Sequence, residues 1–323
     1  MLIDLSEAVE FLKGCEDAVI LTHQSPDGDC IGAGFALKDL LEALGKRSRV
    51  LCSDEFPKRY DFMTSVGSGE EFEPKTVIAV DIADPQLMGN LRETYENKVQ
   101  LCIDHHISNV GYAEKTLLNA GASATCELIY ELADAMKIQM SDHCAACIYT
   151  GMMTDTGGFT YNSNNREIYF IISELLSKGI DKDEIYRRVF NTYSESRLRL
   201  MGYVLSQMKV YPNYHAALIS LTKAEQSQFD YVRGDSEGFV NIPLSIKGVI
   251  FSCFLREDTE KPMIKISLRS VGTFPCNQLA AEFFGGGGHL NASGGEFYGT
   301  MDEARKVFEQ ALEKYKPLLN AKG

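Results

Sequence analysis

Hydrophobic residues in the first 110 positions alternate between short continuous runs and a longer stretch with helical spacing. Continuous apolar runs are typical of buried strands, and they occur at 17–23, 48–52, 76–81 and 99–104. Between the first two runs, apolar residues recur every three or four positions over 31–44, which predicts a helix. Strands that are apolar along their length and alternate with helices predict a parallel sheet covered on both faces.

The later part of the chain has a different pattern. Helical spacing recurs first, and strand-like runs follow it, then a glycine-rich loop and a last helix. The predicted helices are 122–136, 142–153, 183–189, 195–208 and 302–315, and the predicted strands are 216–221, 249–255 and 264–268. We therefore expect an α/β protein with a parallel-sheet domain over 1–190, a helical linker over 191–211 and a smaller α/β domain over 212–323.

Composition narrows the function classes. The 323 residues include 32 Lys and Arg against 45 Asp and Glu, a net charge of −13, which disfavours binding to a long duplex. A short phosphate-bearing substrate in a local basic pocket is compatible with this charge. Acidic Asp4 and Glu7 stand where a secretory signal would be basic, and no apolar run approaches the roughly 20 residues that cross a bilayer. We expect no membrane partner.

The nine cysteines are scattered, and several lie within apolar runs, as is typical of reduced, buried thiols. Cys144 and Cys147, which follow His143, lack the second cysteine pair of a zinc site. We therefore expect them on a buried helix, in the core of the protein. These features favour a cytoplasmic protein.

Acidic and imidazole side chains stand at the ends of the predicted strands. His23 ends the first strand, and Asp27 and Asp29 follow it. Asp81 ends the third strand, and Asp104-His105-His106 ends the fourth. Because the carboxyl ends of parallel strands share one edge of the sheet, we expect these side chains to meet there.

Taken alone, each of these patterns is also typical of a turn, a helix cap or a loop. Their joint position favours a site, and Asp155, after the helix at 142–153, could return to the same edge. So many carboxylates need cations between them, and a mixed His and Asp set suits Mn²⁺ better than Mg²⁺. The number of ligands suits two ions about 3.5–4 Å apart that share one carboxylate.

A second candidate cluster lies near the C-terminus. Arg269 ends a predicted strand, and the run Gly285-Gly286-Gly287-Gly288 precedes His289. Glycines let backbone N–H groups approach a phosphate, and arginine binds phosphate with two parallel hydrogen bonds. A flexible loop and a solvated charge are the alternatives that stay open for these residues.

In this order, the motifs resemble those of the DHH phosphoesterase superfamily, and the glycine loop resembles that of its DHH-associated C-terminal domain. The likeness covers essentially the whole chain and is greatest to the bifunctional oligoribonucleases, or nano-RNases, which also remove the 3′-phosphate of 3′-phosphoadenosine 5′-phosphate (pAp). RecJ-type exonucleases carry further domains for which this chain has no room. Family II pyrophosphatases carry a different C-terminal domain.

The resemblance implies two divalent ions, with Mn²⁺ preferred and Mg²⁺ or Co²⁺ as alternatives. One ion would be bound by His23, Asp27 and Asp81, and the other by Asp29, Asp81, His105 and Asp155, so that Asp81 bridges. It further implies catalytic roles for two residues: His106 would face the scissile phosphate, and Asp104 would orient its neighbours. From across an interdomain cleft that forms the active site, the substrate would be held by Arg269, Gly286, Gly287, Gly288 and His289.

The expected function is that of a phosphodiesterase and exonuclease that degrades short single-stranded RNA or DNA to mononucleotides and dephosphorylates pAp. A hydrolase of linear or cyclic dinucleotides (pGpG, pApA, c-di-AMP) is the alternative with the same chemistry. A non-catalytic nucleotide-binding protein is a third hypothesis, although a pure binder has no need of so many mutually repelling carboxylates. A homodimer is compatible with the sequence.

Overall fold

The computed structural model describes residues 1–321. The chain divides into two compact units, Met1–Thr192 and Tyr193–Gly323, and each has its own sheet and its own hydrophobic core. The sequence predicted a helical linker over 191–211. Helix α9 (Glu195–Ser206) lies within that range, belongs to the second unit and contributes the buried Leu200 to one of its cores.

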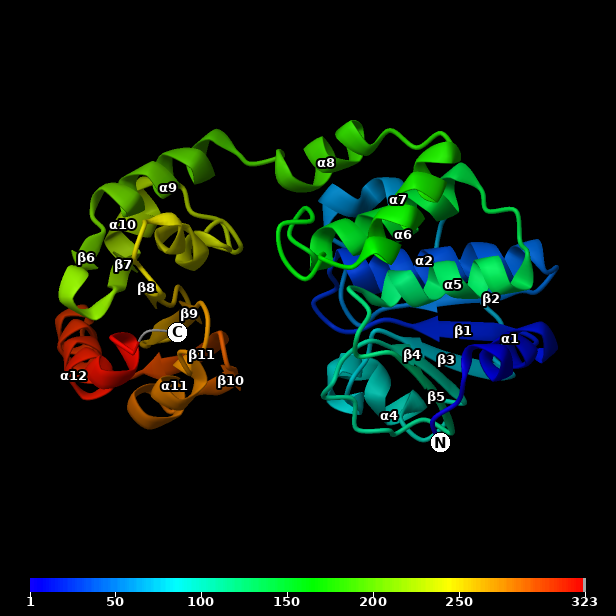
Figure 1. Ribbon diagram of the computed structural model, residues 1–323, viewed down its shortest axis with the longest axis horizontal. Coiled ribbons are helices and arrows are strands. Elements are labelled where there is room, and N and C mark those ends of the chain that lie inside the picture. Colours follow the sequence, from blue (N-terminus) through cyan, green and yellow to red (C-terminus); the bar gives the residue numbers. More distant parts are fainter. Residues whose placement is uncertain (322–323) are drawn as a thin grey trace. The chain divides into compact units, whose positions relative to one another are not determined.

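The sheet of the first unit consists of five parallel strands in the order β2-β1-β3-β4-β5 (Figure 1). They are β1 (Ala18–Leu21), β2 (Ser48–Leu51), β3 (Thr76–Val80), β4 (Leu101–Asp104) and β5 (Lys115–Leu118). All residues of β1, β3 and β4 are buried, as expected for parallel strands covered on both faces. The predicted parallel sheet is confirmed. Strand β5 was not predicted, because its apolar run is too short to stand out in the sequence.

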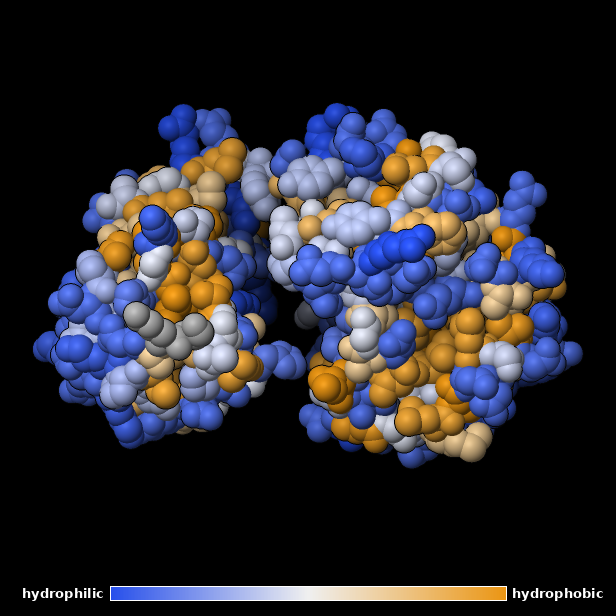
Figure 2. All heavy atoms as spheres, viewed as in Figure 1, coloured by the Kyte–Doolittle hydropathy of each residue, from blue (hydrophilic) through white to orange (hydrophobic). Residues whose placement is uncertain are grey.

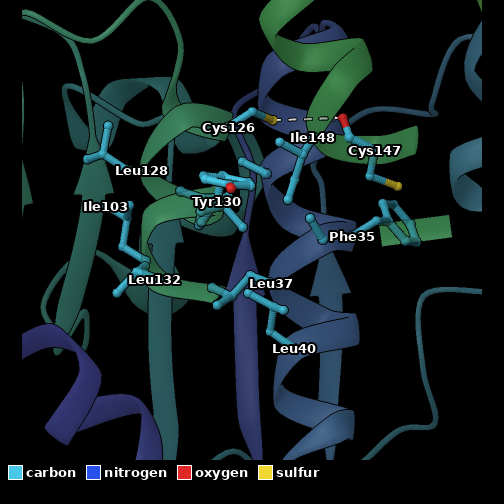
Figure 3. Close-up of a cluster of buried hydrophobic side chains, with 14 of the residues drawn as sticks. Phe35, Leu37, Leu40, Ile103, Cys126, Leu128, Tyr130, Leu132, Cys147 and Ile148 are labelled. Atoms are coloured by element: carbon cyan, nitrogen blue, oxygen red, sulfur yellow. Dashed lines mark hydrogen bonds between the residues drawn. The ribbon is translucent and has the colours of Figure 1, made fainter. Parts of the chain in front are cut away.

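Helices cover both faces of this sheet. They are α1 (Leu5–Gly14), α2 (Gly28–Ala43), α3 (Asp61–Thr64), α4 (Arg92–Tyr95), α5 (Thr125–Met136), α6 (Asp142–Asp155), α7 (Arg166–Ser177) and α8 (Lys182–Phe190), with 3-10 helices η1 (Lys58–Tyr60) and η2 (Pro85–Leu91). Figure 3 shows the core on one face, where Phe35 of α2 lies with Leu128 of α5 and Ile148 of α6. On the other face, Met88 of η2 packs with strand residues such as Val77.

Helix α2 packs closely against both the sheet and α6. A Cβ atom on Gly32 would lie 2.5 Å from the carbonyl oxygen of Cys147 in α6, and one on Gly34 would lie 2.9 Å from the side chain of Thr22. Glycine permits both approaches, so Gly32 lets α2 approach α6 and Gly34 lets it approach the sheet. Cys144 and Cys147 are buried in the core of this unit, which confirms the prediction made for them.

The strand order places a topological switch point between β1 and β3. The chain leaves β1 through α2 toward β2, and it leaves β3 through η2 and α4 in the opposite direction, toward β4. Open α/β sheets bind ligands in the crevice that such a switch point creates at the carboxyl ends of the strands.

The first residues of the chain cover the outer edge of β5. The main chain of Leu2 bridges Thr116, and Ile3 N–H donates to the Thr116 carbonyl over 3.0 Å. Exposed strand edges invite pairing with other chains, and this segment occupies the edge. Met1 and Leu2 stay exposed, and Figure 2 shows hydrophobic residues at the surface of this part of the unit.

The second unit is built on a six-stranded mixed sheet in the order β10-β11-β9-β8-β7-β6. Only β7 and β8 pair in parallel among these strands of residues 1–321. The strands are β6 (Lys209–Tyr211), β7 (Ala216–Leu221), β8 (Phe251–Glu257), β9 (Ile264–Ser270), β10 (Gly287–His289) and β11 (Ala292–Phe297). The predicted smaller α/β domain is confirmed.

Two clusters of buried residues form the interior of the second unit. Helices α11 (Cys276–Phe284) and α12 (Met301–Leu319) contribute to the larger cluster, with Phe251 and Leu268 from the sheet. Helix α9 and the 3-10 helix η4 (Phe239–Ser245) contribute to the smaller one. The remaining elements are α10 (Lys223–Gln228) and η3 (Pro212–Tyr214). No helix within residues 1–321 combines the length and the apolar composition that a membrane span requires.

Candidate metal centre

The carboxyl ends of the strands and the ends of two helices in the first unit carry the predicted site residues. His23 lies two residues after β1, Asp81 directly follows β3, and Asp104 ends β4. Asp27 is the N-cap of α2, and Asp155 is the last residue of α6. The structure brings these side chains together at the switch point, with Asp29, His105 and His106 among them.

His105 lies among three carboxylates. Its Nε2 atom is 3.2 Å from Asp155 Oδ2, 3.8 Å from Asp81 Oδ1 and 3.9 Å from Asp29 Oδ2. Its Nδ1 atom lies 3.2 Å from the carbonyl oxygen of Ala122, which can only accept a hydrogen bond. Nδ1 therefore carries a hydrogen, and Nε2 is the nitrogen that faces the carboxylates.

His23 repeats this arrangement on the other side of Asp81. Its Nδ1 atom lies 2.8 Å from the carbonyl oxygen of Gln24, and its Nε2 atom lies 3.6 Å from Asp27 Oδ1 and 3.7 Å from Asp81 Oδ2. Asp81 thus directs one carboxylate oxygen toward His23 and the other toward His105. A bridging carboxylate has this geometry.

The backbone of Asp81 is strained. Its φ angle is 58°, in the left-handed region that residues with a Cβ rarely adopt. The surrounding structure holds this conformation, since Asp81 N–H donates to the Ile103 carbonyl over 2.9 Å and Thr125 Oγ1 donates to Asp81 Oδ1 over 2.8 Å. Such strain persists where a side chain must point in a direction that ordinary backbone does not allow.

Asp29 is held by the N-terminus of α5. Its Oδ2 atom accepts from Thr125 N–H over 2.6 Å, and its Oδ1 atom accepts from Cys126 N–H over 3.0 Å. The N-cap residue of that helix, Ala124, has no side chain to cap it. A carboxylate from another element therefore satisfies these donors, and the helix dipole stabilises its negative charge.

Asp104 organises the His105–His106 turn. It is fully buried, and its Oδ1 atom accepts from the N–H groups of His105 and His106 over 2.8 and 3.2 Å. The same oxygen lies 2.8 Å from His106 Nδ1, and Asn109 Nδ2 donates to Oδ2 over 2.6 Å. The ring of His106 is thereby oriented, while its side chain stays 40% exposed.

The cluster holds an excess of buried negative charge. Burial, together with the charges of Asp81 and Asp155, raises the pKa of Asp29 well above its usual value. Burial and the neighbouring charge of Asp27 raise the pKa of Asp81 to about 6. Burial lowers the pKa of His105, but its contact with Asp155 and the charge of Asp29 outweigh this and raise it to about 10. All three shifts favour added positive charge, which protons or metal ions can supply.

The donor atoms fit divalent cations. The buried Nε2 of His105 has no hydrogen-bond partner within residues 1–321, although three carboxylates surround it. Among residues 1–321, ligand atoms converge within 4.8 Å of one another in three groups: His23–Asp27–Cys30, Asp81–His105–His106 and Asp29–His105–Asp155. Mixed imidazole and carboxylate ligands suit borderline divalent ions. Cys30 was not predicted, and burial raises the pKa of its thiol well above the usual value, which disfavours the ligating thiolate.

In the second unit, strand register aligns Arg269 with His289. Ala292 of β11 pairs with Arg269 of β9 on one side and with His289 of β10 on the other. Side chains of directly paired residues lie on the same face of a sheet, so Arg269 and His289 flank the small Ala292, two strand spacings or about 10 Å apart. We call these three residues the Arg269–His289 row.

The glycine run is shaped by backbone contacts. Gly285 is the left-handed C-cap of α11, with φ 57°. A Cβ atom on Gly286 would lie 1.9 Å from the Gly294 carbonyl oxygen. The sequence predicted a loop over the whole run. In the structure, Gly287 and Gly288 instead belong to the edge strand β10, in a hairpin that needs the positive φ (136°) of Gly288. Both are exposed there.

Comparison with known proteins identifies the family. The model of the DHH family N-terminal domain matches residues 17–152, and the model of the DHHA1 domain matches residues 213–314. A Thermus thermophilus protein named bifunctional oligoribonuclease and PAP phosphatase NrnA is 30% identical over 97% of this chain and 94% of its own length. This chain belongs to the DHH family.

Two further relatives of this DHH protein cover nearly its full length. A Bacillus subtilis protein, also named bifunctional oligoribonuclease and PAP phosphatase NrnA, is 25% identical over 90% of this chain and 92% of its own. The crystal structure of an exopolyphosphatase-related protein from Bacteroides fragilis matches with a TM-score of 0.92 and 55% identity, over 98% of this chain and 97% of that one. The likeness to these proteins thus extends over nearly the whole chain.

Sequence reasoning missed the residues that orient the predicted site residues of this DHH protein. Thr125 contacts both Asp29 and Asp81, Asn109 holds Asp104, and the carbonyl of Ala122 faces His105. None of them belongs to a residue type or spacing that marks metal chemistry. Only the position of Thr125, at the start of a predicted helix, offered a signal, because helix N-termini attract carboxylates.

Proposed function

We propose that this protein is a metal-dependent phosphoesterase that degrades short oligoribonucleotides to nucleoside monophosphates and removes the 3′-phosphate of pAp. The observation that carries the proposal is the convergence of three carboxylates on the buried Nε2 of His105, which makes no hydrogen bond within residues 1–321. The substrate class rests on the names of the full-length relatives from Thermus thermophilus and Bacillus subtilis.

Two divalent cations, Mn²⁺ by preference, supply the positive charge that phosphoryl transfer requires when they are bound. We propose His23, Asp27 and Asp81 as the ligands of one ion. For the other we propose Asp29, Asp81, His105 and Asp155. Two of these carboxylates are held by main-chain N–H groups before an ion arrives, Asp27 through those of α2 and Asp29 through those of α5. Prior orientation of this kind reduces the rearrangement that binding costs.

His106 is proposed to contact the phosphate. Its Nδ1 is directed at Asp104, which leaves Nε2 as the ring nitrogen available for a phosphoryl oxygen. A hydrogen bond from this nitrogen would stabilise negative charge that develops during the reaction. Asp104 would act through His106, by setting the direction of the ring.

The second unit is proposed to bind one end of the substrate. Arg269 and His289 lie on one face of the sheet with only Ala292 between them, and the exposed Gly287 and Gly288 belong to an edge strand. Edge strands present main-chain N–H groups, which bind phosphate oxygens together with cationic side chains. All nine cysteines are free, which supports a reducing compartment, and we propose the cytoplasm.

Product analysis tests the function. The purified protein is incubated with Mn²⁺ and, in separate reactions, with an RNA trimer, a 24-mer, pAp, c-di-AMP and pyrophosphate. We expect rapid conversion of the trimer to mononucleotides and of pAp to AMP, slow digestion of the 24-mer, and no turnover of pyrophosphate. Parallel reactions with Mg²⁺, Co²⁺ or a chelator rank the metals, and the chelator should abolish every activity.

The same experiment separates the alternatives. Turnover of c-di-AMP with an intact trimer and intact pAp would replace the proposed substrate class by cyclic dinucleotides. Release of phosphate from pyrophosphate alone would point to phosphoanhydride chemistry. Nucleotide binding without any metal-dependent product would favour a non-catalytic binding protein.

A further inference from the structure

A tight turn directly after Asp155 carries an exposed tyrosine. Helix α6 ends at Asp155, and three successive residues then adopt positive φ angles: Gly157 (55°), Gly158 (71°) and Phe159 (64°). The chain reverses, and Tyr161 returns over the turn. The aromatic side chain therefore packs on the turn that follows Asp155, although no motif of the metal centre includes it.

The ring of Tyr161 lies against the backbone of Gly157. A Cβ atom at Gly157 would lie 2.2 Å from Tyr161 Cε1 and 2.8 Å from Cζ, so the ring occupies the space that any other residue would fill. Tyr161 is nevertheless 60% exposed. One side of the ring thus meets the turn, and much of the rest of it meets solvent.

Hydrogen bonds and a ring contact hold the turn in place. Thr156 Oγ1 donates to the Met152 carbonyl over 2.6 Å and accepts from Phe159 N–H over 3.0 Å. The Thr156 carbonyl accepts from Tyr161 N–H over 3.2 Å. The Phe159 ring packs on Tyr149 of α6, with 5.8 Å between the ring centroids. Tyr161 is thus presented on a fixed support, which lowers the entropy cost of a stacking contact.

A second aromatic residue borders the same turn. Tyr186 of α8 is 45% exposed, and its Cε2 atom would lie 3.5 Å from a Cβ atom at Gly158. The two glycines thus have one tyrosine each beside them, next to Asp155. Aromatic rings at the surface beside a phosphate-handling centre are suited to nucleobases, whose faces stack on them whatever the base.

We propose that Tyr161 stacks on a nucleobase adjacent to the scissile phosphate and so determines the preference of the first unit for nucleotides over other phosphate esters. This inference rests on the proposed function. Asp155 contacts His105 in the metal centre, and the ring of Tyr161 lies against Gly157, two residues beyond the helix end that Asp155 forms. A base is separated from its phosphate by a single sugar, so a phosphate at the metal centre brings its base to the region of this turn.

The test compares substrates that differ only in a base. The dinucleotide pApA and two analogues, each with one adenine replaced by an abasic tetrahydrofuran residue, are hydrolysed by the wild type and by Tyr161→Ala, Tyr161→Phe and Tyr169→Ala. Tyr169 of α7 is 53% exposed and serves as the matched control. We expect Tyr161→Ala to raise KM for pApA by roughly 5- to 100-fold with little change in kcat, since stacking contributes in that range per base.

The abasic analogues identify the partner of the ring. For one analogue, Tyr161→Ala and the wild type should have the same KM, because the base that Tyr161 contacts is missing. Tyr161→Phe should behave as the wild type on all three substrates, and so should Tyr169→Ala. An unchanged KM for pApA in Tyr161→Ala, or an equal penalty on all three substrates, would overturn the proposal. If Tyr161→Phe were as defective as Tyr161→Ala, the proposal would also be overturned, because loss of the hydroxyl and not of the ring would then cause the defect.

Failure of the proposed function can be distinguished from failure of the stacking proposal. If the wild type released no product from pApA, the proposed function would be refuted, and the stacking proposal would be tested by calorimetry in the presence of Mn²⁺. AMP should then bind more weakly to Tyr161→Ala than to the wild type, while ribose 5-phosphate should bind equally to both. Equal binding of AMP to the two proteins would overturn the stacking proposal.

Discussion

In the first unit, the acidic side chains at the centre of the cluster are buried and held by fixed partners, whereas in the second unit the proposed phosphate-binding residues lie toward an open sheet edge. Asp29, Asp81 and Asp104 are at most 3% exposed, and main-chain N–H groups or neighbouring side chains hold them. Gly287, Gly288 and His289 are exposed. Groups that act on developing charge benefit from fixed positions in a low dielectric, whereas groups that bind a substrate end must stay accessible.

The two regions also differ in how the backbone creates them. In the first unit, a parallel sheet delivers the carboxyl ends of β1, β3 and β4 to one edge, and loops and helices supply the remaining groups. In the second unit, antiparallel register aligns Arg269 with His289 through Ala292. Topology therefore gathers residues from distant segments in one case, and a single hairpin and its neighbouring strand do so in the other.

The largest expected effect is a loss of kcat when the proposed metal site of the first unit is changed. Asp81→Asn removes the proposed bridging charge, and because metal ions contribute several kcal/mol to the transition state, kcat should fall at least about a thousandfold. Steady-state kinetics on an RNA trimer measures the change. Asp84→Asn is the matched control, since Asp84 caps η2 only three residues away. A kcat close to that of the wild type in Asp81→Asn would place the chemistry outside the first unit's cluster.

A smaller loss should follow from Asp104→Asn, which tests whether orientation in the first unit matters as much as ligation. The amide cannot accept from every donor that Asp104 now satisfies, so the His106 ring loses its fixed direction. Loss of such an orienting partner costs up to about 100-fold, and we expect kcat to fall by roughly that factor while KM changes little. Equal loss in kcat and rise in KM would instead indicate a general disturbance of the site.

Arg269→Ala should affect binding and leave the chemical step nearly unchanged. Loss of one charged hydrogen-bonding group should raise KM by roughly tenfold or more. Arg199→Ala is the control, because Arg199 is an exposed arginine of the same unit that pairs with Glu195 on α9. If KM for the trimer and for pAp were both untouched in Arg269→Ala, the Arg269–His289 row would have no role in substrate binding.

The smallest expected effect is on the stability of the first unit, through a contact between α2 and α6. His143 of α6 directs Nδ1 at Asp39 Oδ2 and Nε2 at the Met63 carbonyl, both over 2.8 Å, and since both partners accept, both nitrogens carry hydrogens. The hydrogen bond to Asp39 raises the pKa of His143, against burial and the charge of Lys38. The stabilisation is therefore complete below the unfolded-state pKa near 6.5 and is lost as pH rises through the folded-state value.

Thermal unfolding at a series of pH values measures this effect. A contribution of about 1 kcal/mol corresponds to a Tm decrease of roughly 2–4 °C between slightly acidic pH, below the unfolded-state pKa, and alkaline pH. His143→Gln should lose that pH-dependent part while retaining the fold. A wild-type Tm that rises with pH over this window, or a variant with the same dependence as the wild type, would contradict the imidazolium assignment.

Much of the first unit could be predicted because its strands are apolar throughout and are separated by helical patterns. Strands β1, β3 and β4 lie within one or two residues of their predicted ranges. The short β5 and the glycine-rich β10 and β11 could not, because few or small side chains leave no periodic signal. In the second unit, the glycines form a hairpin rather than the predicted loop because backbone groups approach where no Cβ fits.

The sequence by itself determined which residue types stand at the strand ends, since a parallel sheet brings those ends to one edge wherever it forms. Tertiary structure alone decided how these side chains are aimed. Thr125 reaches Asp29 across 96 residues, and α6 delivers Asp155 because Gly32 lets α2 approach it. Strand ends follow from local patterns of hydrophobic residues, whereas orientation depends on contacts between segments far apart in the chain, and no local pattern encodes those contacts.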